Sequence, residues 1–229
     1  MGRGRCVILL SGGLDSATVA AIARDSGFDI SAITFSYGQR HDIEIASSRR
    51  IAEFFNITDH RIIQIPSDIF RSALTDRSID VPKNTASING TIPPTYVPAR
   101  NILFLSYALA YAESISASDI FIGANCMDYS GYPDCRPEFF EAFQKMADTG
   151  TKTGINGKPI RITAPLLKMK KSEIIKTGLA LGVDFSMTIS CYDPDKDGRS
   201  CGRCDSCQLR IRGFSEAAVS DPTAYQIKS

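Results

Sequence analysis

The segment Ser11-Gly-Gly-Leu-Asp-Ser16 has the residue types and spacing of a loop that binds phosphate groups. Glycines let the backbone turn tightly and present N–H groups, and the two serine hydroxyls can donate hydrogen bonds to phosphate oxygens. A carboxylate beside a phosphate is repulsive unless a cation lies between them, so Asp15 predicts that Mg²⁺ takes part. The spacing matches neither the G-x-x-x-x-G-K-[ST] loop nor the dinucleotide motif G-x-G-x-x-G. The alternative is a glycine-rich turn in which serine caps a helix and Asp15 lies in its first turn.

Four cysteines near the C-terminal end form a second group: Cys191, Cys201, Cys204 and Cys207. Four thiolates at this spacing can close a tetrahedral zinc site, with Zn–S bonds of about 2.3 Å. An iron–sulfur cluster is the main alternative, but the C-x₂-C-x₂-C run of ferredoxins continues with x₃-C-P, and here Gln208 follows the last cysteine. Unliganded or redox-active cysteines are a third possibility. Because four protein ligands leave no open position, we expect one structural Zn²⁺ that holds the C-terminal segment, where few apolar residues could do so alone.

Charge and composition exclude several classes of protein. With 26 Lys+Arg against 25 Asp+Glu the net charge is +1, which argues against a protein that holds long nucleic acids through phosphate contacts. The two histidines exclude a metal site built from several histidines. No apolar run approaches the ~20 residues needed to span a bilayer, and the apolar run near the N-terminus is too short for a signal peptide. We therefore expect a cytoplasmic protein without a membrane partner, in which clustered cysteines bind metal rather than form disulfides.

The elements that must position these residues alternate between short β-branched runs and longer helical patterns. This alternation predicts βαβ units and a doubly wound, mostly parallel α/β sheet. Strands are expected at residues 6–10, 30–35, 60–65 and 119–123, and helices at residues 14–25, 42–55, 101–113, 137–147 and 170–181. The alanine-rich helix at 101–113 is expected to be buried. The phosphate-binding loop thus follows the first strand, where doubly wound folds bind phosphates at a helix N-terminus.

The chain of 229 residues has room for one α/β domain and a small appendage. We place the nucleotide-binding domain at residues 1–185 and the zinc-binding segment, packed on it, at residues 186–229. Residues 76–97 contain Pro82, Pro93 and Pro94 and show no periodicity, which is typical of a long surface loop. Because such loops are uncommon in compact domains and are frequently functional, this loop is our candidate for a lid.

The hexapeptide at residues 11–16 resembles the SGG-x-DS loop of the PP-loop, or N-type, ATP pyrophosphatases. That resemblance implies a fold like that of the adenine nucleotide alpha hydrolases, with ATP bound at the end of strand one. It also implies attack of a substrate oxygen on the α-phosphate, with release of pyrophosphate, and catalytic roles for Asp15, Ser16 and Arg100. The residues implied to bind ATP are Leu10, Ser11, Gly12, Gly13, Leu14, Asp15, Ser16, Ala17, Thr18, Val19 and Ala20.

Further strings narrow the resemblance: Phe35-Ser-Tyr-Gly-Gln-Arg-His41, Tyr96-Val-Pro-Ala-Arg-Asn101, Gly123-Ala-Asn125 with Asp128, and Ser130-Gly-Tyr-Pro-Asp-Cys-Arg-Pro-Glu-Phe139. With the loop and the four cysteines they resemble the family of 7-cyano-7-deazaguanine synthases of queuosine biosynthesis, over residues 6 to about 210. The resemblance implies an ATP-dependent carbon–nitrogen ligase. Such an enzyme converts 7-carboxy-7-deazaguanine and ammonia to the nitrile through an amide intermediate. The resemblance also implies a homodimer that binds no nucleic acid.

The residues implied to bind the substrate follow strands or begin helices: Tyr37, Gln39, Asn101, Asp128, Tyr132, Asp134 and Arg136. Asp128 or Asp134 could pair with the guanidine-type edge of a purine-like base, and Arg136 could hold the substrate carboxylate with two hydrogen bonds. The structural alternatives are Tyr132 as a turn residue, Asp134 as a helix N-cap and Arg136 as a surface cation. Cys135 is available as a nucleophile, but ligation of a carboxylate requires none.

Three other functions compete with this one. A tRNA-thiolating PP-loop enzyme would need a basic RNA-binding extension and a cysteine that carries a persulfide, and the net charge and length disfavour it. A synthetase coupled to a glutaminase would need a second domain, so we expect ammonia, free or from a partner, to supply nitrogen. A zinc-finger binding module would have no need of the loop at residues 11–16.

Overall fold

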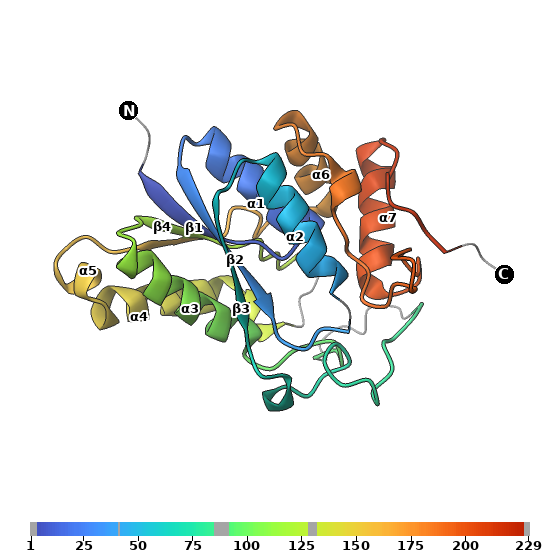
Figure 1. The fold of residues 1–229 in the computed structure, drawn as a ribbon, viewed down its shortest axis with the longest axis horizontal. Helices are drawn as coiled ribbons and strands as arrows, with labels where there is room; N and C mark the ends of the chain where they lie inside the picture. Colours follow the sequence, from blue (N-terminus) through green and yellow to red (C-terminus); the bar gives the residue numbers. More distant parts are fainter. Residues whose placement is uncertain (1–3, 41, 85–91, 128–131, 227–229) are drawn as a thin grey trace.

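A five-stranded parallel sheet forms the centre of the molecule (Figure 1). The computed structural model describes residues 4–40, 42–84, 92–127 and 132–226. The strands are β1 (Arg5–Leu9), β2 (Asp29–Ser36), β3 (Asp59–Gln64), β4 (Asp119–Phe121) and β5 (Arg161–Thr163), in the spatial order β3-β2-β1-β4-β5. Every neighbouring pair is parallel, which confirms the predicted doubly wound sheet.

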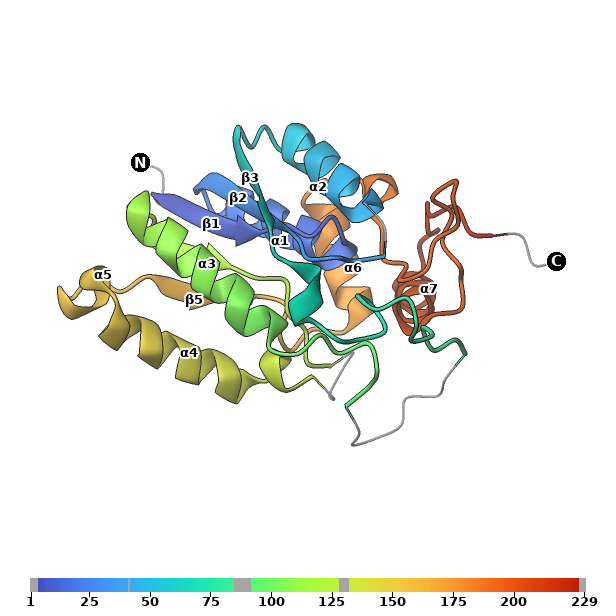
Figure 2. The ribbon, with the colours of Figure 1, turned by 60° about the horizontal axis from the view of Figure 1, so that its bottom comes forward.

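Helices cover both faces of this sheet (Figure 2). They are α1 (Leu14–Asp25), α2 (Ile43–Phe54), α3 (Arg100–Ser114), α4 (Pro137–Gly150), α5 (Lys152–Ile155), α6 (Lys171–Ala180) and α7 (Asp205–Ala217), with 3₁₀ turns at Ser67–Ile69, Pro133–Cys135 and Phe185–Met187. The faces form separate cores because alternate residues of β1 point in opposite directions. Cys6 and Ile8 pack with α1 and α6, whereas Val7 and Leu9 pack with α3 and α4.

The position of β1 between β2 and β4 creates a crevice at the edge of the sheet. The first half of the chain continues from β1 to β2 and β3, and the second half adds β4 and β5 on the other side. Ligands of such folds bind at this reversal, outside the carboxyl ends of the strands. Gly123, just after β4, closely approaches the loop after β1, since a Cβ at Gly123 would lie 3.1 Å from the backbone nitrogen of Ser16.

Several predicted elements differ from those observed. α3 was expected to be buried, and this prediction is wrong. Ile102 is 46% exposed and Tyr107 is 41% exposed, because only one face of the helix packs on the sheet. α5 and β5 were not predicted, since elements of four and three residues carry too little periodicity. The described parts of residues 76–97 contain no helix or strand, as predicted.

The C-terminal segment packs more closely on the sheet domain than expected. Helix α7 brings Phe214 and Ala217 into the same core as α1 and α6. The rings of Phe185 and Phe214 meet edge to face with their centroids 5.7 Å apart. A few well-placed apolar residues therefore join this segment to the main core, in addition to the contacts made through the cysteine cluster.

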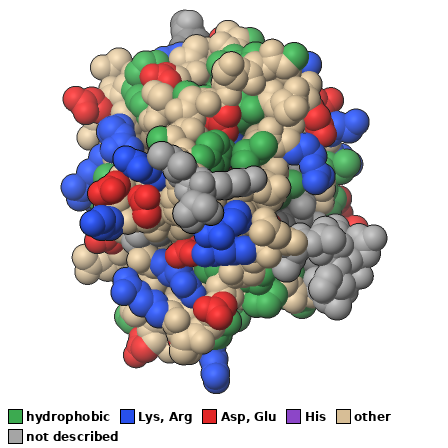
Figure 3. All heavy atoms as spheres, turned by 90° about the vertical axis from the view of Figure 1, so that its right-hand side faces the viewer, with side chains coloured by type: hydrophobic (Ala, Val, Ile, Leu, Met, Phe, Trp, Pro, Cys, Tyr) green, Lys and Arg blue, Asp and Glu red, His purple; other side chains and the backbone are tan. Residues whose placement is uncertain are grey.

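Two surface properties bear on the expected partners. No helix in the described part of the chain has both the length and the hydropathy needed to cross a membrane. At the end of the molecule that carries α7, basic and acidic side chains are interspersed (Figure 3). This face therefore lacks the uniformly basic surface that holds nucleic-acid backbones.

Candidate active site

A pocket of about 260 Å³ opens at the carboxyl ends of β1, β2 and β4. Its walls combine apolar side chains from the strand ends with polar groups from α1, α3, α6 and the C-terminal segment. Of the residues predicted from the sequence, those that line it are Leu10, Ser11, Gly13, Leu14, Asp15, Ser16, Tyr37, Arg100, Asn101 and Tyr132. The structure thus brings together half of the residues expected to hold ATP and substrate, together with Arg100.

The loop after β1 is pressed against α2 through Gly12. This glycine has φ +87°, and a Cβ there would lie 2.3 Å from the carbonyl oxygen of Glu44. The carbonyl of Gly12 accepts hydrogen bonds from the Ser47 hydroxyl at 2.8 Å and from the Ile189 N–H at 3.1 Å. The loop therefore has a fixed shape, and only glycine fits at position 12.

The two serines of the loop contact each other across it. The hydroxyl of Ser11 donates to Ser16 Oγ at 3.1 Å, and Ser16 donates to the carbonyl of Gly13 at 3.0 Å. The predicted ATP-binding residues further along the chain do not reach the pocket. Ala17, Thr18, Val19 and Ala20 are fully buried, because this part of α1 packs on the sheet and on α6.

Asp15 faces Lys171, the first residue of α6. The Lys171 ammonium donates to both carboxylate oxygens of Asp15, at 2.8 and 2.9 Å, and both residues line the pocket. The Asp15 side chain remains 29% exposed. Lys171 was not predicted as a site residue. In the sequence it is one of two lysines at the start of the helix predicted at 170–181.

Arg100 reaches the pocket from the N-terminus of α3. Its guanidinium donates to the hydroxyl of Tyr37 at 3.4 Å, and both side chains line the pocket. The preceding residue, Ala99, has φ +54°, a conformation that L-residues with a Cβ seldom adopt. Its N–H donates to the hydroxyl of Tyr96 at 3.0 Å. The strained turn sets the direction in which α3 begins and so positions Arg100.

Asp134 and Asn101 join the start of α3 to the turn before α4. The carboxylate of Asp134 accepts the Asn101 backbone N–H at 3.0 Å, and the Asn101 amide donates to the Asp134 carbonyl at 2.9 Å. Asp134 is buried and does not line the pocket. Its carboxylate therefore caps α3, whereas the structural alternative from the sequence placed it at the start of α4.

Two other predicted substrate residues, Gln39 and Arg136, do not line the pocket. Gln39 holds the turn after β2, because its amide accepts the Tyr37 N–H at 2.8 Å and donates to the Phe35 carbonyl at 3.1 Å. Arg136 is exposed at the N-terminus of α4. Asp128 lies outside the described residues. Tyr132, by contrast, lines the pocket and shares a hydrogen bond of 2.8 Å with Thr95.

Glu44, in the first turn of α2, is a pocket residue that the sequence analysis missed. Burial raises the pKa of its carboxyl to about 7, although the positive charge of Arg100 acts in the opposite direction. Its only signal in the sequence was an acidic residue in the first turn of a predicted helix. Acidic residues are common in the first turn of a helix because they interact favourably with the helix dipole, whatever the function of the protein.

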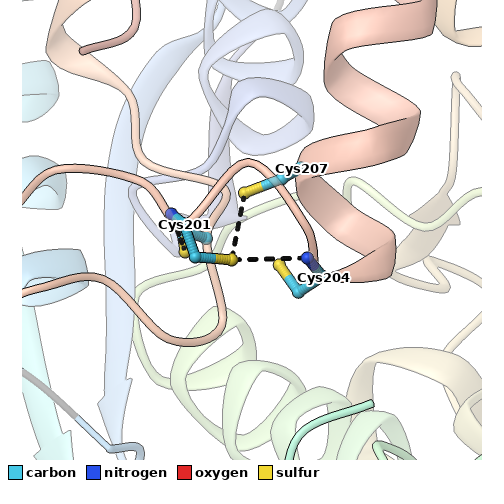
Figure 4. Close-up of side chains that lie close together, drawn as sticks. Cys201, Cys204 and Cys207 are labelled. Carbon is cyan, nitrogen blue, oxygen red and sulfur yellow. Dashed lines mark hydrogen bonds between the residues drawn. The ribbon is translucent and has the colours of Figure 1, made fainter. Parts of the chain in front are cut away.

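The four cysteines gather in one buried cluster, as predicted, and Figure 4 shows three of them with their sulfur atoms turned toward one another. All four sulfur atoms lie within 4.8 Å of one another. Backbone N–H groups of Cys201, Arg203 and Cys204 donate to cluster sulfurs at 3.1 to 3.4 Å. Such hydrogen bonds stabilise negative charge on sulfur, and the four cysteines could hold a metal ion.

Residues beside the cysteine cluster form one wall of the pocket. Tyr192, next to Cys191, lines the pocket together with Ser206 and Arg210 of α7. The buried guanidinium of Arg210 pairs with Asp221 at 3.0 Å and donates to the Thr188 hydroxyl and the Phe185 carbonyl. On the outer side, Lys83 of the 76–97 loop pairs with Asp193 at 2.6 Å. The cluster is thus connected to the pocket and to the candidate lid.

Comparisons with known proteins identify the family of this chain. A model of the family described as queuosine biosynthesis protein QueC matches residues 5–218. The 7-cyano-7-deazaguanine synthase of Pseudomonas putida (strain F1) is 54% identical over 222 residues, which cover 96% of this chain and 98% of the relative. That of Azoarcus sp. (strain BH72) is 53% identical over 225 residues, 98% of each chain.

The solved structure of a 4-thiouridine synthetase–RNA complex with bound ATP is similar in fold. It matches with a TM-score of 0.50 and 16% identity, over 97% of this chain and 47% of that one. At this identity the likeness concerns the fold alone. The family assignment comes from the matches in sequence, which extend over the loop, the pocket and the four cysteines. This chain belongs to the family described as queuosine biosynthesis protein QueC.

Proposed function

We propose that this chain is an ATP-dependent ligase that converts 7-carboxy-7-deazaguanine and ammonia to 7-cyano-7-deazaguanine. The observation that carries the proposal is the convergence of the loop at residues 11–16, the Asp15–Lys171 pair and Arg100 in one pocket. Relatives that are 53% and 54% identical over nearly the whole chain are named 7-cyano-7-deazaguanine synthases. The charges of the pocket suit the two anions, ATP and a carboxylate, that this reaction joins.

Charge complementarity suggests which residues of the pocket bind ATP and which bind the carboxylate substrate. The N–H groups of the loop, the N-terminus of α1 and Lys171 attract the phosphates of ATP. Arg100 is placed to hold the carboxylate of the second substrate. When phosphates compete for Lys171, the Asp15 carboxylate is released and can hold Mg²⁺ beside them. A bound Mg²⁺ would neutralise phosphate charge there.

Activation by ATP solves a chemical problem of the carboxylate. Hydroxide is a poor leaving group, and ammonia adds poorly to an anion. Attack of the carboxylate oxygen on the α-phosphorus gives an acyl adenylate, whose neutral carbonyl carbon accepts ammonia and releases AMP. Because the nitrile contains neither oxygen of the acid, the amide formed first is activated a second time through its own oxygen. The apolar strand ends at Leu9, Phe35 and Ile122 favour exclusion of water, which would hydrolyse the adenylate.

We propose Zn²⁺ as the ion of the cysteine cluster. Bonds of about 2.3 Å to a central ion place tetrahedral sulfur ligands roughly 3.8 Å apart. Cys201 and Cys207 have their sulfur atoms 4.0 Å apart, and all four lie within 4.8 Å. An iron–sulfur cluster inserts several iron and sulfide atoms between its cysteines and would need wider spacing. With four protein ligands the ion has a structural role, which is to hold the wall that contains Tyr192.

The tRNA-thiolating alternative has less support from the described residues. Burial raises the pKa of Cys6 to about 12 and the pKa of Cys135 to about 11, so both remain protonated at neutral pH. The thiol of Cys126 donates to the Leu167 carbonyl at 2.9 Å. A cysteine that carries a persulfide needs an accessible thiolate, and Cys6 and Cys135 lack that environment.

One incubation tests the proposal. The protein is mixed with ATP, ammonium and 7-carboxy-7-deazaguanine, and the products are followed by mass spectrometry. We expect the amide and then the nitrile, with loss of both when ATP or ammonium is omitted. A protein that leaves the acid unchanged but incorporates sulfur into tRNA would support the alternative instead.

A further inference from the structure

Two carboxylates line the described part of the pocket, and they differ in their surroundings. Asp15 is engaged by Lys171 at 2.8 Å. The carboxylate of Glu44 forms no hydrogen bond or ion pair with any described residue, although Arg100 is close enough to influence it. Glu44 is held in place by its backbone, because its carbonyl packs on Gly12 of the phosphate-binding loop. The pocket therefore holds a carboxylate on a fixed backbone position, which the proposed handling of ATP does not use.

We propose that Glu44 is the general base that accepts the proton from the nitrogen nucleophile when ammonia attacks the activated carboxyl carbon. This proposal rests on the proposed function. Its location supports it: the backbone of Glu44 touches the loop that binds the phosphates, so the side chain lies near the reacting end of the substrate rather than near its distant purine edge. Arg100, our candidate to hold the substrate carboxylate, faces the same space.

The acid–base properties of Glu44 suit this role. A general base works best when its pKa lies near the working pH. Burial raises the pKa of Glu44 to about 7, whereas the nearby guanidinium of Arg100 limits the rise. At neutral pH a substantial fraction is ionised and can accept a proton, and the protonated form can afterwards return that proton to solvent.

The step balances as follows. The lone pair of ammonia forms a bond to the carbonyl carbon of the acyl adenylate, and the added nitrogen carries a positive charge and one surplus proton. Glu44 accepts that proton. The bond between the carbon and the AMP oxygen breaks, and its electron pair leaves with AMP. The products are the amide, AMP and protonated Glu44. After Glu44 has returned its proton to solvent, the second round begins: the nitrogen of the adenylated amide loses one proton to solvent, and Glu44 accepts the other as AMP departs and the nitrile forms.

Glu44→Gln tests the assignment because it keeps the shape of the side chain and removes its basicity. Glu53→Gln, on an exposed position of the same helix, is the matched control. Each variant is assayed for acid-dependent exchange of pyrophosphate into ATP without ammonia, which reports adenylation alone. Each is then assayed for amide and nitrile formation with ammonium, and for hydroxamate formation with hydroxylamine. The electron-withdrawing hydroxyl makes the nitrogen of the hydroxylamine adduct more acidic than that of the ammonia adduct, so loss of its proton depends less on a base.

For Glu44→Gln we expect pyrophosphate exchange close to that of the wild type and amide formation slower by roughly 10²- to 10⁴-fold. The loss with hydroxylamine should be much smaller, and Glu53→Gln should match the wild type in all three assays. Equal losses in exchange and amide formation would assign Glu44 to substrate binding and overturn the proposal, as would full activity with ammonium. Absence of exchange in the wild type would instead contradict the proposed function itself.

Discussion

Lys171 and Asp15, 156 residues apart in the chain, form an ion pair in which the lysine nitrogen lies 2.8 Å from one carboxylate oxygen and 2.9 Å from the other. The pair stands at the mouth of the phosphate-binding loop, and the side chains are 12% and 29% exposed. Each charge compensates the other while the loop holds no phosphate. In the proposed function, a nucleotide with its cation would offer each of them a new partner of opposite charge.

Asp15→Asn should preserve the fold and remove most ATP turnover. The amide retains the size of the carboxylate but lacks the charge needed to hold Mg²⁺ beside phosphates, and the partly exposed ion pair contributes only about 0–1 kcal/mol to stability. Thermal unfolding and ATP–pyrophosphate exchange measure the two effects. Asp25→Asn, exposed at the other end of α1, is the control and should behave as the wild type. Full exchange by Asp15→Asn at saturating Mg²⁺ would refute the role given to Asp15.

Gly12→Ala should destabilise the protein far more than Gly27→Ala. Both glycines have positive φ, +87° and +81°, so each alanine incurs the left-handed backbone penalty of about 1–2 kcal/mol. Only at Gly12 does the new methyl also meet backbone, 2.3 Å from the Glu44 carbonyl, whereas nothing lies within 4 Å at Gly27. Urea unfolding should therefore show an additional loss of about 1–3 kcal/mol for Gly12→Ala. Equal losses in the two variants would mean that the loop does not depend on this contact.

The part of the site that is local in sequence was predictable, and the part made by tertiary contacts was not. The strand, loop and helix around residues 6–25 have their own turn chemistry and periodicity, and α1 begins and ends at the predicted residues. The cysteine spacing likewise predicted the observed cluster. Lys171 and Glu44 stand at helix starts, where charged residues are ordinary, and only the folding of α6 and α2 against the loop brings them to the pocket.

The C-terminal helix illustrates the same limit. Residues 205–217 were not predicted to form a helix, although α7 is observed there. Arg210 looks like a surface residue in the sequence, yet its guanidinium is buried and pairs with Asp221 at 3.0 Å. A buried arginine is tolerated only where several acceptors surround it, and here those acceptors come from segments on both sides of the cysteine cluster.

Replacement of Asp134 should separate a positioning role from a role in recognising the substrate. Asp134→Ala removes the cap of α3 and should lower the free energy of unfolding by about 0.5–2 kcal/mol. Activity should also fall, because the first turn of α3 no longer fixes the orientation of Arg100. Asp134→Asn keeps an oxygen that accepts the Asn101 N–H, and should retain most of both properties. A rise in KM for the deazaguanine acid in Asp134→Asn, without loss of stability, would instead show that the carboxylate pairs with the purine edge.

Cys204→Ser should remove bound metal and weaken ATP binding as well. The cluster holds the wall of the pocket that contains Tyr192, so its loss should loosen that wall in addition to lowering stability. Metal analysis should find one zinc per chain in the wild type and in Cys126→Ser, which alters a cysteine outside the cluster. Iron with inorganic sulfide in the purified protein would contradict the assignment of zinc.

The most direct test of the proposed chemistry follows the oxygen atoms of the substrate. The acid is labelled with ¹⁸O in its carboxylate and converted by the wild-type protein with ATP, Mg²⁺ and ammonium, and the phosphorus-containing products are examined by mass spectrometry. Attack of the carboxylate on the α-phosphorus transfers one labelled oxygen to AMP in the first round, and the amide oxygen carries a second label to another AMP in the next. We therefore predict label in AMP and none in pyrophosphate. Label confined to inorganic phosphate would show attack at the γ-phosphorus and contradict adenylation at this loop.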